Sequence, residues 1–275
     1  MIEALDNIVA RIDRGLMAAG AILSEYQPGD VAVRYKQGDD PVTEADQRVD
    51  AALRQILPAQ GEGWLSEETA DSAERLECRD VWIVDPLDGT REFVSGIPEW
   101  CVSIGFVREG RPVAGGTYNP ATGEKVIGAA GIGAVRNNEP CAASRRQSLA
   151  GASICASRSE VKRHEWDRFA NAPFTVVPCG SVAYKLSLVA SGRCDATWTL
   201  VPKHEWDVAA GVALVLASGG RVFAVDGSRV TFNQPRPKLA GLIATGPHLA
   251  SEVAAFLEID LSVLSTRPAD QYRRL

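Results

Sequence analysis

The spacing of apolar positions divides the chain into two parts with different rhythms. In the first part, apolar residues recur at helical spacing over 2–24, and a second amphipathic helix is predicted over 43–57. Two later segments, 108–111 and 119–123, are typical of hairpin turns, so the sheet of this part should be largely antiparallel. Short apolar runs predict its strands at 63–66, 80–84, 100–107, 112–118, 124–129 and 132–136.

From about Ala150 onward, strands and helices alternate. We expect strands at 152–156, 174–177, 195–199, 220–224 and 239–244. We expect helices at 160–171, 181–191, 206–218 and 247–257. The pattern predicts a mixed α+β and α/β protein built from stacked layers, with an α+β domain at 1–145 and an α/β domain at 146–275.

Composition excludes several classes of protein. The chain has 275 residues, of which 45% are hydrophobic, enough for one large core or two smaller ones. A net charge of −6 argues against binding to a nucleic-acid polymer, which needs a basic surface. No apolar run approaches the roughly 20 residues of a membrane span, and residues 1–6 do not resemble a signal peptide. The six cysteines lack metal-site spacing, so we expect free thiols and a cytoplasmic protein.

The sequence Asp-Pro-Leu-Asp-Gly-Thr at 85–90 carries the clearest chemical signal. It follows directly on a buried apolar run, where a carboxylate is costly unless something positive neutralises it. Pro86 fixes a turn there, so that Asp85, Asp88 and the carbonyl of Leu87 can converge on one point. Such hard oxygen atoms are the ligands that Mg²⁺ prefers.

Gly89 and Thr90 are expected to begin a helix, which would place free backbone N–H groups, and hence a phosphate site, beside the cation. The alternative is an ordinary turn at the end of a strand. In that case Asp85 and Asp88 would only cap the next helix.

Three other acidic segments bear on this choice. Each has an ordinary explanation: Glu67 can belong to a solvated edge, Asp46 to a capping box begun by Thr43, and Asp207 to the favourable first turn of a helix. Their joint occurrence favours a metal site. Two divalent cations would balance four carboxylates and shield a phosphate dianion from repelling its nucleophile.

These segments together resemble the inositol monophosphatase superfamily of Mg²⁺-dependent, lithium-sensitive phosphomonoesterases. The matching pieces occur in the family's order: Asp40 to Asp46 (D-x-V-T-x-A-D), Ser66-Glu67-Glu68, Asp85 to Thr90 (DPLDGT) and Trp206 to Gly211 (WDVAAG). The resemblance implies a five-layered αβαβα sandwich. It also implies direct attack by water on a small phosphorylated metabolite, and it allows a homodimer.

The resemblance assigns roles to individual residues. It implies two or three Mg²⁺ ions, which Mn²⁺ may replace, bound by Glu67, Asp85, Asp88, Asp207 and the carbonyl of Leu87. It implies that the catalytic residues are Asp46, Thr90 and Glu67, with Asp46 and Thr90 orienting the attacking water. The candidate substrate-binding residues are Gly89, Thr90, Ser157, Arg158, Gly180, Ser181, Lys185 and Asp207.

The substrate is less firmly indicated. Segments such as Ser157-Arg158-Ser159 are most similar to the 3′(2′),5′-bisphosphate nucleotidase branch, which implies adenosine 3′,5′-bisphosphate as substrate. Lys185 resembles that branch's phosphate-binding lysine, although it lies one residue further along the chain and can also be a surface lysine. Glu160 and Thr199 depart from the pattern, since that branch often has histidine and a basic residue there.

Two alternatives remain. The first is an inositol monophosphatase or another polyol or sugar phosphatase, although Thr199 also replaces the acidic residue with which those enzymes hold inositol hydroxyls. The second is a metal-binding regulatory protein that has lost catalysis. It is disfavoured because every motif residue is present.

Overall fold

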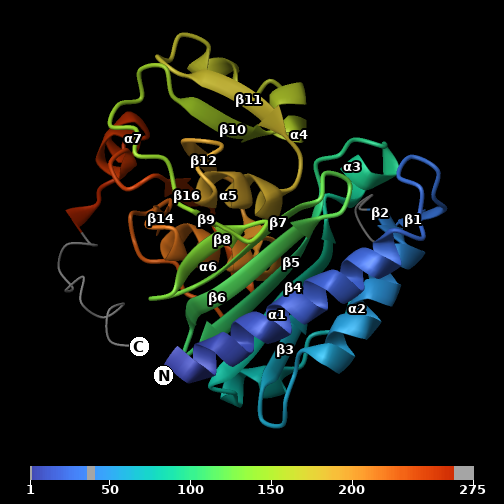
Figure 1. Cartoon of the computed structure of the whole chain (residues 1–275). Helices are drawn as coiled ribbons and strands as arrows, with labels where there is room; N and C mark the ends of the chain where they lie inside the picture. Colours follow the sequence, from blue (N-terminus) through green and yellow to red (C-terminus); the bar gives the residue numbers. More distant parts are fainter. Residues whose placement is uncertain (1, 36–40, 263–275) are drawn as a thin grey trace.

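The computed structural model describes residues 2–35 and 41–262, so Asp40 of the first motif lies outside the described residues. The chain forms five layers of alternating helices and sheets (Figure 1). The α-helices are α1 (Ile2–Leu23), α2 (Glu44–Ile56), α3 (Thr90–Val94), α4 (Arg158–Lys162), α5 (Val182–Ala190), α6 (Glu205–Ala217) and α7 (Ala250–Phe256). Two 3₁₀ turns are η1 (Ala73–Glu77) and η2 (Asp167–Phe169).

The larger sheet contains seven strands in the order β3 to β9. Only β3 and β4 are parallel and every other neighbouring pair is antiparallel, which confirms the predicted character of this sheet. Its strands are β3 (Gly63–Ser66), β4 (Asp80–Asp88), β5 (Cys101–Arg108), β6 (Arg111–Asn119), β7 (Glu124–Ala129), β8 (Gly133–Arg136) and β9 (Glu139–Cys141).

The second sheet has five strands in the order β11-β10-β12-β16-β14. Strand β10 is parallel to β11 and β12, whereas β16 is antiparallel to β12 and β14. Its strands are β10 (Ser153–Ser157), β11 (Thr175–Cys179), β12 (Ala196–Thr199), β14 (Arg221–Ala224) and β16 (Leu242–Thr245). Two small ribbons complete the fold: β1 (Val33–Tyr35) with β2 (Pro41–Thr43), and β13 (Lys203–His204) with β15 (Lys238–Leu239).

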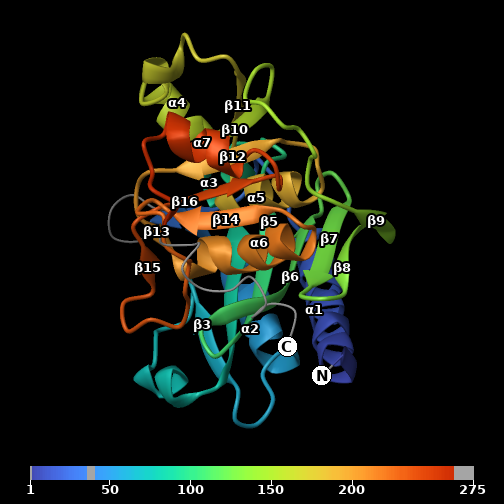
Figure 2. The same ribbon diagram turned by 90° about the vertical axis from the view of Figure 1, so that its left-hand side faces the viewer.

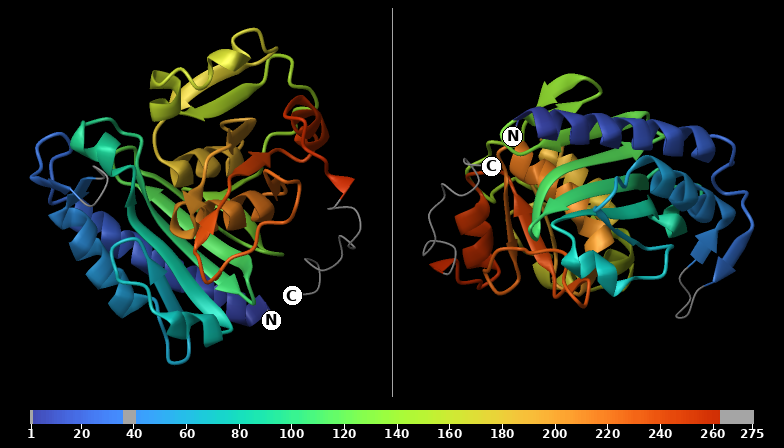
Figure 3. Two further views of the ribbon diagram at one scale, coloured as in Figure 1. Left: turned by 180° about the vertical axis from the view of Figure 1, so that it is seen from behind. Right: turned by 90° about the horizontal axis from the view of Figure 1, so that it is seen from below.

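Helices cover both faces of the seven-stranded sheet. Figure 3 shows α1 and α2 side by side on its outer face, and Figure 2 shows α5 and α6 between the two sheets. Successive side chains of β4 point to opposite faces of the sheet. Trp82 and Val84 pack in the core beneath α1 and α2, and Val81 and Ile83 pack in the core formed with α5 and α6. Helix α7 packs on the outer face of the five-stranded sheet. The predicted layered sandwich is therefore confirmed.

Three of the predicted elements differ from the structure in a way that has a physical reason. Strand β4 does not end at Val84 but continues to Asp88, with a register irregularity between Asp85 and Asp88. The helix predicted over 160–171 is α4 followed by η2, because the chain turns at His164, whose φ is 64°. The strand predicted over 239–244 is divided into β15 and β16 around Gly241.

Helix α6 approaches the seven-stranded sheet at two glycines. A Cβ atom on Gly105 would lie 2.9 Å from the Cβ of Ala209, and one on Gly115 would lie 2.5 Å from the carbonyl oxygen of Ala210. On the opposite face, a Cβ on Gly116 would meet the side chain of Ile12 at 2.4 Å. The absence of side chains at these positions lets both helix layers contact the sheet backbone closely.

We expect Gly115→Ala to destabilise the protein. The new methyl group would push against helix backbone, which cannot rotate away, and overpacking of this kind costs about 1–3 kcal/mol. Urea denaturation would measure the change in the free energy of unfolding. Ala121→Ser, in the exposed turn after β6, is the control and should change it by less than about 0.5 kcal/mol. Equal stability of the two variants would contradict the tight contact.

Candidate active site

A cavity of about 550 Å³ opens where β4 and the first turns of α3, α5 and α6 meet. Segments far apart in the sequence therefore contribute to one site, including both halves of the chain. Its lining includes most of the predicted site residues: Glu67, Asp85, Leu87, Asp88, Gly89, Thr90, Ser157, Gly180, Ser181, Lys185 and Asp207.

The irregularity in β4 shapes the floor of the cavity. Asp85 pairs with Ser103 and Asp88 pairs with Cys101, so β4 has one residue more than β5 between these pairs. Pro86 lies in this stretch and has no backbone N–H to give to a ladder. The Asp85 carboxylate instead accepts the backbone N–H of Leu87 at 3.0 Å. The predicted turn after Val84 is thus a bulge within the strand.

Asp88 connects the sheet to helix α5. One of its oxygen atoms accepts the Ser181 hydroxyl at 2.6 Å and the Ala183 backbone N–H at 2.5 Å. Ser181 is the N-cap of α5 and Ala183 lies in its first turn. Asp88 therefore stabilises the start of α5, whereas the helix that follows Asp88 in the sequence is α3. The simple alternative, in which Asp88 only caps the next helix, is therefore wrong.

Asp207 is held at the start of α6. Its carboxylate accepts the backbone N–H of His204 at 3.0 Å, as in a capping box. This contact uses one carboxylate oxygen, and Asp207 also lines the cavity. Asp207 can therefore stabilise the first turn of α6 and also contribute a carboxylate oxygen to the cavity.

Asp46 and Thr90 form a hydrogen-bonded pair. One Asp46 oxygen accepts the backbone N–H of Thr43 at 2.8 Å and its hydroxyl at 2.6 Å, which confirms the predicted capping box. The other oxygen lies 3.1 Å from the Thr90 hydroxyl, which is also 3.0 Å from the carbonyl oxygen of Leu87. Asp46 is buried behind Thr90, while Thr90 itself lines the cavity.

The loop that carries Glu67 is fixed by a buried residue of α2. Asp50 accepts the hydroxyls of Ser66 and Thr69, each at 2.5 Å, on either side of Glu67. The backbone N–H of Glu67 bonds to the carbonyl of Val84 at 3.3 Å. The sequence analysis did not single out Asp50. Its position in the apolar pattern of a helix, one turn after Asp46, is the only sequence signal for it.

The cavity carboxylates destabilise one another's charged forms. Burial, followed by the negative charges of Glu67, Asp88 and Asp207, holds the pKa of Asp85 well above its usual range. Burial and the charges of Asp88 and Glu67 likewise raise the pKa of Asp207 well above its usual value. The pKa of Asp88 is raised by burial as well, although its hydrogen bonds and the ammonium groups of Lys185 and Lys203 oppose the shift.

This donor set fits a hard divalent cation. Carboxylates whose pKa values are raised by mutual repulsion gain most from a positive charge placed among them. Within the described ranges, no three acidic, histidine or cysteine side chains already stand in the arrangement of a metal site. The residues thus present suitable ligands in one cavity but not a preformed ligand cluster.

Lys185 lies inside the protein and not on its surface. It is 4% exposed, lines the cavity, and donates from Nζ to the carbonyl oxygen of Ser181 at 2.8 Å. The surface-lysine alternative is therefore wrong. Arg158, in contrast, lies outside the cavity lining and forms a bidentate ion pair with Glu99 at 2.5 and 2.9 Å. This pairing leaves Arg158 poorly placed to bind substrate.

Several cavity residues were not foreseen from the sequence. Lys203 and Lys238 add positive charge, and Glu92 adds a carboxylate whose pKa is raised, first of all by burial. His204 also lines the cavity and stacks on Trp206 with ring centroids 4.3 Å apart. Lys238 reaches the site because β15 pairs with β13. Local sequence patterns do not predict this pairing.

The remaining sequence expectations concern the thiols and the membrane. All six cysteines are free, as predicted; four of them are buried, and Cys78 and Cys141 are half-buried. In the described part of the chain, no helix is long and apolar enough to cross a membrane.

Comparisons with known proteins agree with this architecture. The sequence model of the inositol monophosphatase family matches residues 7–258. Inositol monophosphatase 3 of Solanum lycopersicum is 35% identical over 246 residues, covering 84% of this chain and 89% of that protein. The 3′(2′),5′-bisphosphate nucleotidase CysQ of Aggregatibacter actinomycetemcomitans is 31% identical over 229 residues, covering 78% and 84%.

A solved structure is similar over nearly the whole length. The extragenic suppressor protein suhB from Bartonella henselae superimposes with a TM-score of 0.78 at 28% identity, covering 93% of this chain and 98% of that chain.

Proposed function

The chain belongs to the inositol monophosphatase family, and from this premise we propose that its cavity hydrolyses a small phosphomonoester with the help of Mg²⁺. The phosphatase reaction itself follows from the family. The observation that carries the proposed site is the gathering of Glu67, Asp85, Asp88 and Asp207 around one cavity beside the Thr90–Asp46 pair.

The four carboxylates and the carbonyl of Leu87 would hold the metal, for which we propose two or three Mg²⁺ ions, replaceable by Mn²⁺. When bound, the cations neutralise the phosphate charge and lower the pKa of water, so that a nucleophile is available near neutral pH. The binding residues come from three elements, each with its own support. The strand bulge shapes β4, the capping box fixes the start of α6, and the contacts of Asp50 hold the loop after β3.

Thr90 and Asp46 would position the attacking water and receive its proton. The Thr90 hydroxyl has one proton, which it can donate to Asp46 at 3.1 Å, leaving its oxygen to accept from a water in the cavity. Burial raises the pKa of Asp46 above its usual value, so this carboxylate takes up a proton more readily than an exposed one. Because Asp46 is also fixed by Thr43, the pair is held in a single orientation.

The sequence motifs favour adenosine 3′,5′-bisphosphate as the substrate. Its second phosphate needs cations away from the metal ligands, and the cavity provides Lys185, Lys203 and Lys238. Arg158, also expected in this role, is bound to Glu99. We therefore infer that any second phosphate would be met by the lysines alone.

A second candidate is inositol phosphate or the phosphate of another polyol. It is favoured by relatives such as inositol monophosphatase 3 of Solanum lycopersicum, whose name gives this activity to that protein.

We expect activity to depend on a divalent cation. Chelation should abolish phosphate release, Mg²⁺ or Mn²⁺ should restore it, and excess Ca²⁺ should inhibit because its coordination is larger and looser. Asp88→Asn should weaken both the apparent Mg²⁺ affinity and the rate, since it removes a negative charge from the site. Phosphate release from a panel of small phosphomonoesters is the measurement.

The control for this experiment is Asp226→Asn, which removes an exposed carboxylate outside the cavity and should leave metal dependence unchanged. Full activity of a metal-stripped sample would refute the proposed chemistry. No phosphate release under any metal condition would support the alternative of a catalytically inactive metal-binding protein.

We expect Thr90→Ala to slow the chemical step without loss of the metal. Removal of the group that positions and deprotonates water should lower kcat by ~10²–10⁴. The apparent Mg²⁺ affinity should change little, because the carboxylates remain. Thr90→Ser keeps the hydroxyl and is the matched variant, which should retain most of the rate. If Thr90→Ala weakens Mg²⁺ binding as much as Asp88→Asn does, the proposed role is wrong.

We expect Lys185→Met to separate the two substrate candidates. If adenosine 3′,5′-bisphosphate is the substrate, loss of a charge-assisted contact of ~1.5–3 kcal/mol should raise its KM about ten- to a hundredfold relative to that of inositol 1-phosphate. Steady-state kinetics on both esters give this ratio. Equal effects on both would mean that Lys185 acts only through Ser181 and Asp88, which it stabilises.

A further inference from the structure

Helix α2 presents two buried carboxylates, and each of them holds a different part of the proposed active site. Asp46 and Asp50 are four residues apart, so they lie one turn from each other on the same side of the helix. Asp46 accepts the hydroxyl of Thr90 at 3.1 Å, whereas Asp50 accepts the hydroxyls of Ser66 and Thr69, each at 2.5 Å. One rigid helix therefore relates the position of Thr90 to that of the segment that begins at Ser66.

Glu67 lies where the backbone of this segment leaves the seven-stranded sheet. Strand β3 ends at Ser66, which pairs with Val84, so Glu67 is the first residue beyond the ladder. Its backbone N–H reaches the carbonyl oxygen of Val84 at 3.3 Å, which is at the long end of the hydrogen-bond range. No helix or strand begins again before Ala73, the first residue of η1. Beyond the sheet, the two contacts of Asp50 thus anchor the backbone on both sides of Glu67.

The other proposed metal ligands are fixed by the elements that carry them. Asp85 and Asp88 lie within β4, which is paired with β5 at both positions. Asp207 lies in the first turn of α6, and its carboxylate forms part of the capping box of that helix. Glu67 differs because it lies in a loop whose course depends on a side chain from another helix. Loss of the Asp50 contacts should therefore affect Glu67 more than the other three carboxylates.

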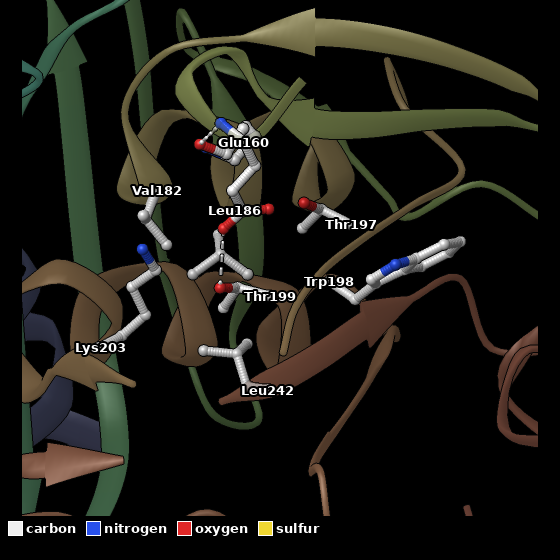
Figure 4. A pocket seen from close by; sticks show the side chains of 10 residues that line it. Glu160, Val182, Leu186, Thr197, Trp198, Thr199, Lys203 and Leu242 are labelled. Carbon is white, nitrogen blue, oxygen red and sulfur yellow. Dashed lines mark hydrogen bonds between the residues drawn. The ribbon is translucent and has the colours of Figure 1, made fainter. Parts of the chain in front are cut away.

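Other buried carboxylates hold structural partners. Glu160 faces the hydroxyl of Thr199 at 3.4 Å across a small pocket (Figure 4) and accepts the indole N–H of Trp166 at 3.0 Å. Glu205 accepts two backbone N–H groups of the loop at 233–234. Within the described part of the chain, neither of these contacts reaches a segment that carries a proposed metal ligand, and this is the respect in which Asp50 stands apart.

We propose that Asp50 is a positioning residue that sets the affinity of the site for its divalent cation, acting through Glu67. This inference rests on the proposed function, because it takes Glu67 as a metal ligand. With both hydroxyl contacts in place, the backbone keeps a single course, and the Glu67 carboxylate is already held near Asp85 before a cation binds. Without these contacts, the loop must be ordered on binding, and that cost is subtracted from the affinity.

The test measures cation binding directly, by isothermal titration calorimetry of the full-length protein with Mn²⁺ in the absence of substrate. Thr69→Val keeps the size of the side chain but removes its hydroxyl, and Ser66→Ala removes the other donor. We expect each variant to weaken Mn²⁺ binding and the double variant to weaken it about ten- to a hundredfold, as is usual for groups that orient a metal ligand. The Mg²⁺ concentration for half-maximal phosphate release should rise in parallel, while KM for the ester at saturating Mg²⁺ should change little.

Two control variants separate positioning from stability. Thr69→Ser keeps the hydroxyl and should retain the wild-type affinity for Mn²⁺. Ser144→Ala is the matched control, because Ser144 also donates at 2.5 Å to a carboxylate, that of Asp195, in a segment outside the cavity lining. Loss of that contact should lower the unfolding temperature without changing Mn²⁺ binding.

Unchanged Mn²⁺ affinity in the double variant would overturn the inference. An equal loss of affinity in Ser144→Ala would overturn it as well, since the effect would then follow stability alone. If the double variant does not fold, equal Mn²⁺ affinities of Thr69→Val and Thr69→Ser would be the contradicting result. Phosphate release by a metal-stripped wild-type protein, or no Mn²⁺ binding by the wild type, would instead refute the proposed function on which the inference rests.

Discussion

The close contact between helix α6 and the seven-stranded sheet determines where the site can form. Gly105 and Gly115 have no side chains, so the helix backbone at Ala209 and Ala210 lies directly on β5 and β6. Asp207 is only two residues before Ala209, and it therefore enters the same cavity as Asp85, which lies on the neighbouring strand β4. A helix held further from the sheet would also hold Asp207 further away.

This packing places negative charges together that repel one another. Raised pKa values at Asp85 and Asp207 show the electrostatic cost of the arrangement, which the fold must balance with favourable contacts elsewhere. Hydrogen bonds from Leu87 and His204 satisfy only one oxygen of each carboxylate. Rigid elements of the fold keep these mutually repelling carboxylates together, which is a common arrangement at functional sites.

Much of the site could be predicted from the sequence because its carboxylates lie within short, local motifs. Segment 85–90 combines a strand end, a proline and two aspartates, so the local geometry already brings oxygen atoms together. Asp46 was also predictable, since its helix cap is formed within three residues. The alternation of strands and helices likewise indicated the layered fold, although not the extents of α4 and β4.

Contacts between distant segments could not be predicted in this way. Lys238 joins the site through the pairing of β13 with β15, and Glu160 meets Thr199 only because α4 lies above the end of β12. Arg158 shows the opposite error. Its sequence position favoured a contact with substrate, but its side chain forms an ion pair with Glu99, 59 positions away. Such partners depend on tertiary packing, for which neither periodicity nor motif spacing provides a signal.

The cavity brings charges of both signs close together. Burial and then the charges of Glu67, Asp88 and Asp207 raise the pKa of Asp85, whereas Lys185 and Lys203 oppose the rise in the pKa of Asp88, and Lys203 also opposes it at Asp207. The lysines therefore offset part of the repulsion among the carboxylates but not all of it, because the pKa values of Asp85, Asp88 and Asp207 all remain raised. The cavity thus keeps an excess of negative charge on the side chains proposed as metal ligands, beside lysines that suit an anionic substrate.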